Sequence, residues 1–233
     1  EQALNTLLPH ASNFIVITQA PYCSTNNLKE WATFLRTSDN KLNGLLSFLS
    51  SARAVWSPYS VNVDFLSQYQ NIQHYQIGYH PILHYEHATT EKKWILAVCG
   101  EYTKQRAHIA QTIVENIPKT TSTIGLTHLN RDITLHQSMF QLVLPFDFGE
   151  NFYSSPLELC TGFFHNIPTL AIKTPLDEAY EKQGFIIPSI NDLLPQLNHY
   201  LHNNPKAIFK QKQAQFFSSP FTRTVEQLLE KSL

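Results

Sequence analysis

The sequence predicts an α/β protein: a Rossmann-like, doubly wound parallel sheet in its second part, preceded by a short, partial α/β domain. Short runs rich in β-branched and aromatic residues, each the length of a buried strand, alternate with longer segments of helical spacing. The first part holds only about three such runs, against the five or six strands of an ordinary sheet. We therefore expect the first part to be about half of a domain.

The amino-terminal domain is expected at residues 1–77. Apolar, β-branched runs predict its strands, and apolar residues at helical spacing predict the helices between them. The strands are predicted at 14–18, 52–56 and 73–77, and the helices at 28–36, 42–51 and 59–69.

Residues 78–92 show no clear periodicity and are expected to be an interdomain linker. Three histidines fall here, His80, His84 and His87, at spacings that would place them on one face of a helix. However, Pro81 lies among them and no carboxylate completes a ligand set. The sequence therefore predicts no metal site in this segment.

The second domain is expected at residues 93–205, with strands and helices in alternation. Its strands are predicted at 94–99, 122–124, 140–146, 168–172 and 185–188, and its helices at 103–116, 130–138, 175–183 and 191–202, with a further helix that begins at Pro156. Two more helices, 206–217 and 222–231, follow in the segment 206–233.

An acidic pair lies between the predicted strands 140–146 and 168–172. Seven residues separate Glu150, in a loop, from Glu158, one turn into the helix that begins at Pro156. Ser154 and Ser155 are good N-cap residues, and proline is well tolerated at the first helical position. This order of strand, loop, helix and strand places the acids at the carboxyl ends of strands, where α/β sheets bind ligands.

The amino terminus of that helix is expected to bind an anion such as a diphosphate, because its backbone N–H groups and dipole favour negative charge. Carboxylates beside a diphosphate would accept hydrogen bonds from neutral hydroxyls, a combination that suits a nucleotide sugar. Gly100, between a strand and a helix, has the form of a phosphate-binding turn. Lys104 and Arg106 lie in the first turn of the helix predicted from Thr103 and oppose its dipole, which favours a functional role. Lys104 is expected to be solvated, and for Arg106 both a functional role and simple solvation stay open.

A structural alternative stays open for Glu158. Ser155-Pro156-Leu157-Glu158 fits a capping box, in which Glu158 would accept from the backbone N–H of the N-cap residue and bind no ligand.

The segment E-N-F-Y-S-S-P-L-E-L-C-T-G, with I-P-T-L-A after it, resembles the E-x7-E donor-site signature of GT-B glycosyltransferases. Three earlier segments, F-I-V-I-T-Q-A-P, I-G-Y-H-P and I-L-A-V-C-G-E-Y-T-K-Q-R, resemble successive blocks of bacterial and viral members, which are family 1-like transferases. The resembling blocks occur in the family's order from about residue 14 to residue 205.

The resemblance implies a GT-B-like glycosyltransferase that moves a sugar from a nucleotide-diphosphate donor to a glycan or other acceptor. Glu150 would be catalytic and hold the transferred sugar. The donor would be bound by Gly100, Arg106, Ser154, Ser155 and Glu158, without a metal or other cofactor. It favours retention of configuration, with inversion left open, and implies that the carboxy-terminal helices, 206–233, pack back on the first domain.

The chain also departs from the family. Its first domain is short, the segment F-F-H-N-I-P lacks the glycine that is common before the I-P-like pair, and Gln19 stands where an acid is usual. A non-catalytic GT-B-like module that binds a nucleotide sugar, a glycan or a protein is therefore the alternative. A related reaction, nucleotide-sugar epimerisation, would need an acid or histidine opposite Glu150.

Composition excludes other classes of function. With a net charge of −1, the chain lacks the basic character of nucleic-acid-binding proteins. Cys23, Cys99 and Cys160 lack metal-ligand spacing and are expected to be free thiols in a reducing compartment, the cytoplasm. No apolar run approaches the ~20 residues of a membrane span, although peripheral membrane contact stays open. Because the chain begins at Glu1, we expect a fragment or a processed chain.

Overall fold

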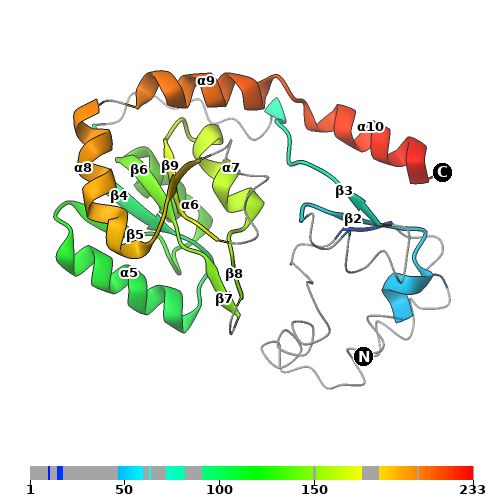
Figure 1. Ribbon diagram of the computed structural model, residues 1–233, viewed down its shortest axis with the longest axis horizontal. Helices are drawn as coiled ribbons and strands as arrows, with labels where there is room; N and C mark the ends of the chain where they lie inside the picture. Colours follow the sequence, from blue (N-terminus) through cyan, green and yellow to red (C-terminus); the bar gives the residue numbers. More distant parts are fainter. Residues whose placement is uncertain are drawn as a thin grey trace. The chain divides into compact units, whose positions relative to one another are not determined.

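The computed structural model describes residues 10, 15–17, 47–59, 63, 72–81, 91–148, 151–174, 184–203 and 205–232. The chain divides into two compact units, each described by itself (Figure 1). Unit 1 comprises Glu1–Ile77, Phe148–Asn151 and Thr222–Leu233, and unit 2 comprises Gly78–Asp147 and Phe152–Phe221.

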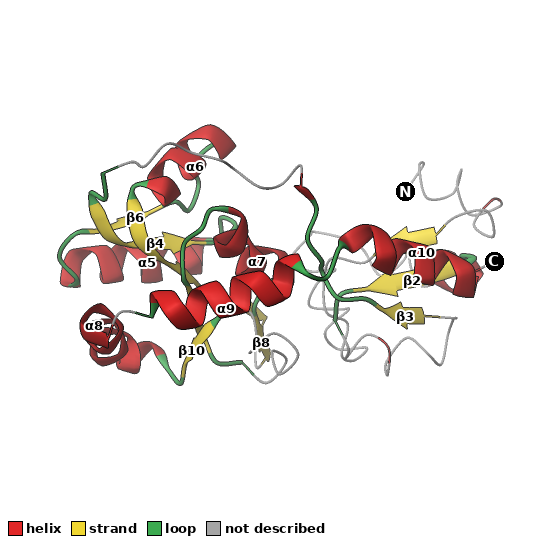
Figure 2. Cartoon of the chain, turned by 90° about the horizontal axis from the view of Figure 1, so that it is seen from above, coloured by secondary structure: helices red, strands yellow, loops and turns green. Residues whose placement is uncertain are grey.

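Unit 1 contains a three-stranded parallel sheet in the order β1-β2-β3. Its strands are β1 (Ile15–Ile17), β2 (Ala54–Ser57) and β3 (Ile72–His74). Helix α10 (Phe221–Ser232) lies beside this sheet, and its Leu228 packs against Ala54 and Trp56 of the buried central strand (Figure 2). The sheet and the last helix of the chain therefore share one apolar core.

Ser232, at the end of α10, joins the helix to two strands. Its hydroxyl accepts from Trp56 Nε1 at 3.2 Å and from Gln73 Nε2 at 3.3 Å, and it donates to the Leu228 carbonyl at 2.7 Å. Ser232→Ala is expected to lower the free energy of unfolding by about 1–3 kcal/mol, because it removes the acceptor of both N–H groups. Urea denaturation measures this. The exposed Ser218→Ala is the control, and equal losses in the two variants would contradict the prediction.

Unit 2 is built on a five-stranded sheet in the order β10-β9-β6-β4-β5, in which every neighbouring pair is parallel. The strands are β4 (Trp94–Cys99), β5 (Thr120–Ser122), β6 (Ser138–Val143), β9 (Thr169–Ile172) and β10 (Phe185–Ile187). The chain passes from β4 to β5 on one side and then returns to β6 on the other. The predicted Rossmann-like, doubly wound α/β fold is confirmed, and its strand order reverses between β4 and β6.

The remaining elements are the helices of unit 2 and one small sheet, whose residues Phe148 and Asn151 belong to unit 1. The helices are α5 (Lys104–Asn116), α6 (His128–His136), α7 (Pro156–Phe164), the 3-10 helix η4 (Ile190–Asp192), α8 (Leu193–Asn203) and α9 (Lys206–Phe217). The small sheet pairs β7 (Phe146–Phe148) with β8 (Asn151–Tyr153).

Several predicted elements of unit 2 are shifted along the chain. The strand expected at 140–146 is β6 at 138–143, because its register with β4 already begins at Ser138, opposite Trp94. The predicted strand 122–124 is β5 at 120–122, and the predicted helix 130–138 is α6 at 128–136. Helices predicted at 28–36 and 175–183 lie outside the described residues.

The two carboxy-terminal helices pack on different units. Whereas α10 packs in unit 1, α9 packs on α7 of unit 2, with the rings of Phe209 and Phe216 at 5.8 and 5.0 Å from that of Phe163. Gln213 of α9 also donates to the Phe163 carbonyl at 2.8 Å. The expectation that the whole segment 206–233 packs on the first domain is therefore corrected for α9, whose aromatic face belongs to the core of unit 2.

The first residues of the predicted linker have a defined structure. Tyr79 exchanges backbone hydrogen bonds with Ser219 (3.0 Å) and Phe221 (2.8 Å), and a Cβ atom on Gly78 would lie 2.7 Å from the Ser219 carbonyl oxygen. Glycine is therefore required where these two segments run side by side. Within the described ranges no group of three His, Cys, Asp or Glu could hold a metal, and His84 and His87 lie outside them.

Two further expectations concern cysteines and membrane spans. Cys99 and Cys160 are buried and take part in no disulfide, whereas Cys23 lies outside the described residues. Of the helices that the structure describes, none has both the length and the apolar character that crossing a membrane requires.

Candidate functional site

The candidate site lies at the carboxyl edge of the unit 2 sheet, where the strand order reverses between β4 and β6. Two loops leave the sheet here: one follows Cys99 of β4, and the other follows Val143 of β6. The first loop leads to α5, and the second leads through β7 and β8 to α7. In α/β sheets the crevice at such a reversal is the usual place for a ligand.

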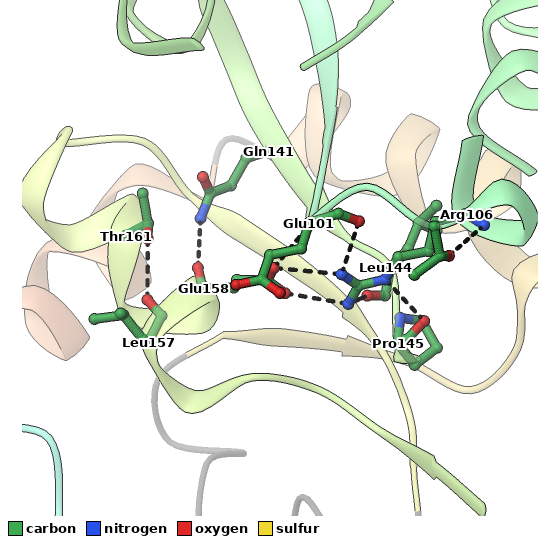
Figure 3. A network of polar contacts seen from close by, with 9 residues as sticks. Glu101, Arg106, Gln141, Leu144, Pro145, Leu157, Glu158 and Thr161 are labelled. Atoms are coloured by element: carbon green, nitrogen blue, oxygen red, sulfur yellow. Dashed lines mark hydrogen bonds and ion pairs between the residues drawn. The ribbon is translucent and has the colours of Figure 1, made fainter. Parts of the chain in front are cut away.

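Arg106 of α5 lies at the centre of this site, with only 2% of its side chain exposed. Nε donates to the Pro145 carbonyl at 3.2 Å, Nη1 to the Glu101 carbonyl at 3.3 Å, and Nη2 to the Leu144 carbonyl. Nη1 and Nη2 also bind the two carboxylate oxygens of Glu158, at 3.4 and 3.2 Å (Figure 3). Since a guanidinium has five N–H groups, these five bonds use all of them.

Gly100 makes room for this guanidinium. A Cβ atom at this position would lie 2.8 Å from Nη1 and 3.0 Å from Cζ of Arg106. Its φ of +149° is also one that residues with a side chain rarely adopt. The glycine of the strand-to-helix turn is therefore required by the packing of Arg106 against it.

Glu158 lies in the first turn of α7, with 18% of its side chain exposed. Besides its two bonds to Arg106, Oε1 accepts from the Glu101 backbone N–H at 2.9 Å. Burial raises the pKa of Glu158 above its ordinary value, while the charge and hydrogen bonds of Arg106 and the Glu101 N–H act to lower it. The pair joins α5, α7 and the two strand-end loops through side chains and backbone carbonyls.

The capping-box alternative is not what the structure contains. Ser155 is the N-cap residue of α7, but its hydroxyl makes no capping hydrogen bond, and Glu158 binds Arg106 and Glu101 instead of the Ser155 N–H. The first-turn N–H groups of α7 therefore receive no capping hydrogen bond from Ser155 or Glu158. They lie beside the Glu158 carboxylate at the reversal of strand order.

The structure brings together Gly100, Arg106 and Glu158, while Ser154 and Ser155 immediately precede α7. Glu150 lies outside the described residues, in the interval between β7 and β8. Whether any of these residues binds a donor stays a prediction. Sequence reasoning missed the carbonyls of Glu101, Leu144 and Pro145, which carry no side-chain signal.

Comparisons with known proteins show the fold. The sequence matches no protein-family model and no curated protein. The structure resembles that of TarM with a TM-score of 0.55 and 9% identity, over 84% of this chain and 46% of TarM. It also resembles the structure of accessory secretory proteins 1, 2 and 3 of Streptococcus pneumoniae, with a TM-score of 0.52 and 9% identity, over 99% of this chain and 57% of that one.

The chain thus spans about half the length of each neighbour. At 9% identity the likeness concerns the fold alone, which is GT-B-like.

Proposed function

We propose that this chain is part of a glycosyltransferase that moves a sugar from a nucleotide-diphosphate donor to a glycan or other acceptor. One observation carries the proposal: the Glu158 carboxylate and the first turn of α7, which neither Ser155 nor Glu158 caps, lie together at the reversal of strand order in a glycosyltransferase-like fold. The N–H groups of this turn would bind an anion, and the carboxylate would accept a hydrogen bond from a hydroxyl group.

In this proposal the protein stabilises the negative charge that develops on the departing diphosphate. The first-turn amides and the dipole of α7 bind the phosphates, with Ser154 and Ser155 at the entrance to the helix and Gly100 in the facing turn. Glu158 accepts from a ribose hydroxyl, and Glu150 holds the transferred sugar. Because amides and dipole neutralise the diphosphate, the reaction requires no metal or other cofactor. The buried thiols Cys99 and Cys160, which take part in no disulfide, favour a reducing compartment such as the cytoplasm.

Thermal unfolding with a panel of UDP-, GDP- and ADP-sugars and the matching diphosphates tests donor binding. A ligand at a hundred times its Kd is expected to add about 2.7 kcal/mol to the free energy of unfolding, which raises the midpoint. Glu158→Gln keeps the shape of the side chain and removes its charge, so the stabilisation by ligand is expected to fall sharply in this variant.

Glu115→Gln, near the carboxyl end of α5, is the matched control and should keep the full ligand effect. The comparison must be the shift caused by ligand within each variant, because Glu158 is also paired with Arg106 and its variants lose stability without ligand. If no nucleotide shifts the midpoint of the unchanged protein, donor binding by this chain is refuted.

A non-catalytic binding module is the second candidate, and one observation favours it. The bonds of Arg106 and most acceptor positions of Glu158 are satisfied inside the chain, so a structural role alone accounts for the pair. A module that binds a glycan or a protein predicts no nucleotide binding, whereas a module that binds a nucleotide sugar predicts binding without any transfer or hydrolysis of the sugar.

A further inference from the structure

We propose that Arg106 is a positioning residue, which acts on the ligand through Glu158 by holding its carboxylate ionised and in one orientation. This inference rests on the proposed function, because it assigns Glu158 the contact with a ligand hydroxyl. It differs from the sequence-based expectation that Arg106 itself contacts the phosphates.

The hydrogen bonds of Arg106 argue for an indirect role. Each of its five N–H groups already has an acceptor: the three carbonyls of Glu101, Leu144 and Pro145 and the two oxygens of Glu158. A phosphate contact would require one of these bonds to break inside a site where the guanidinium is 2% exposed. Gly100 packs against the same group and leaves no space beside it on that side.

The acceptor positions of Glu158 define what it can still bind. An ionised carboxylate offers about four acceptor positions, two on each oxygen. Oε1 accepts from Glu101 N–H and Arg106 Nη1, and Oε2 accepts from Arg106 Nη2. Among the described residues nothing else donates to Oε2, so one position is left for a single hydroxyl of the ligand.

The ionised state of the Glu158 carboxylate depends on the positive charge of Arg106. Burial and, to a smaller extent, the charge of the Glu101 carboxylate raise the pKa of Glu158, and Arg106 is the main group that opposes this effect. Without Arg106 the carboxylate would take up a proton at a higher pH and would then lose acceptor capacity towards a hydroxyl. Nucleotide binding should therefore strengthen as pH rises through the pKa of Glu158.

Calorimetric titration with UDP, GDP and ADP between pH 5.5 and 8.5 tests the inference. In Arg106→Gln the pH midpoint for binding is expected to move upward by about one pH unit or more relative to the unchanged protein, a tenfold or larger change in proton affinity. Arg106→Lys keeps the charge and should move it less. Lys104→Gln, which removes an exposed cation from the same helical turn, should not move it.

Inorganic pyrophosphate separates the two roles, because it lacks a ribose. Positioning through Glu158 predicts unchanged pyrophosphate affinity in Arg106→Lys, whereas a direct phosphate contact predicts weaker affinity at every pH. A uniform loss of nucleotide affinity without a shifted midpoint would also overturn the inference.

Nuclear magnetic resonance of the Glu158 side-chain carboxyl carbon, without nucleotide, keeps the test independent of ligand binding. The midpoint of its titration should rise in Arg106→Lys and further in Arg106→Gln, and an unchanged midpoint would refute the role of Arg106. If the unchanged protein binds no nucleotide while this midpoint shifts, the proposed function fails and the effect of Arg106 on Glu158 stands.

The single acceptor position left on Glu158 predicts that it binds either the 2′- or the 3′-hydroxyl of the ribose, and not both. Of the 2′-deoxy and 3′-deoxy forms of the bound nucleotide, only one should bind weaker, by about tenfold or more. Equal weakening of both forms would refute recognition of a single hydroxyl.

Discussion

Glu158→Ala is expected to lower the free energy of unfolding by about 3–5 kcal/mol, because it leaves the Arg106 guanidinium buried without a counter-charge. Arg106 cannot turn to solvent, since three backbone carbonyls and the packing of Gly100 hold it in place. The Glu101 N–H also loses its acceptor in this variant. Equilibrium unfolding in urea at pH 7 measures the loss.

The control for this prediction is a double-mutant cycle. Arg106→Met and Glu158→Met combined should cost less than the sum of the two single changes, because the double variant buries no unpaired charge. Glu115→Ala, which removes a carboxylate near the end of α5, should change stability by less than about 0.5 kcal/mol. A loss below about 1 kcal/mol for Glu158→Ala would show that the pair is not buried as described.

Gly162→Ala is expected to lower the free energy of unfolding by about 3 kcal/mol, through overpacking between α7 and β9. The added Cβ atom would lie 2.1 Å from Thr169 Oγ1 and 2.4 Å from the Ile167 carbonyl oxygen, distances that no side-chain rotation of residue 162 can relieve. The higher helix propensity of alanine, about 1 kcal/mol, offsets only part of the cost. Because α7 carries Glu158, ligand binding should weaken as well.

Gly184→Ala is the matched control, since its Cβ atom would also approach Thr169, but at 3.3 Å from the carbonyl oxygen. Thermal unfolding of the two variants should show a clearly larger fall of the midpoint for Gly162→Ala. Comparable midpoints would contradict the close approach of α7 to β9.

The sequence alone determined those elements whose signals lie in adjacent residues. The apolar run 94–99 is β4 without any shift, and α9 occupies the predicted residues 206–217. The start of α7 after Ser155 also follows from local chemistry, because a proline is well tolerated at the first helical position, although the Ser155 hydroxyl makes no capping bond there. The order of elements was enough to predict the fold class, and with it the edge of the sheet that holds the site.

Only the tertiary structure decided the partners of the site residues. Arg106 and Glu158 are 52 positions apart in the chain and meet because β4 and β6 are neighbours in the sheet. The sequence allowed Glu158 to cap its own helix, Arg106 to meet a phosphate and α9 to pack on the first domain. The strand order and the positions of the backbone carbonyls decide between these alternatives. Folding brings the carbonyls of distant residues to Arg106, and the local pattern of residues does not encode that arrangement.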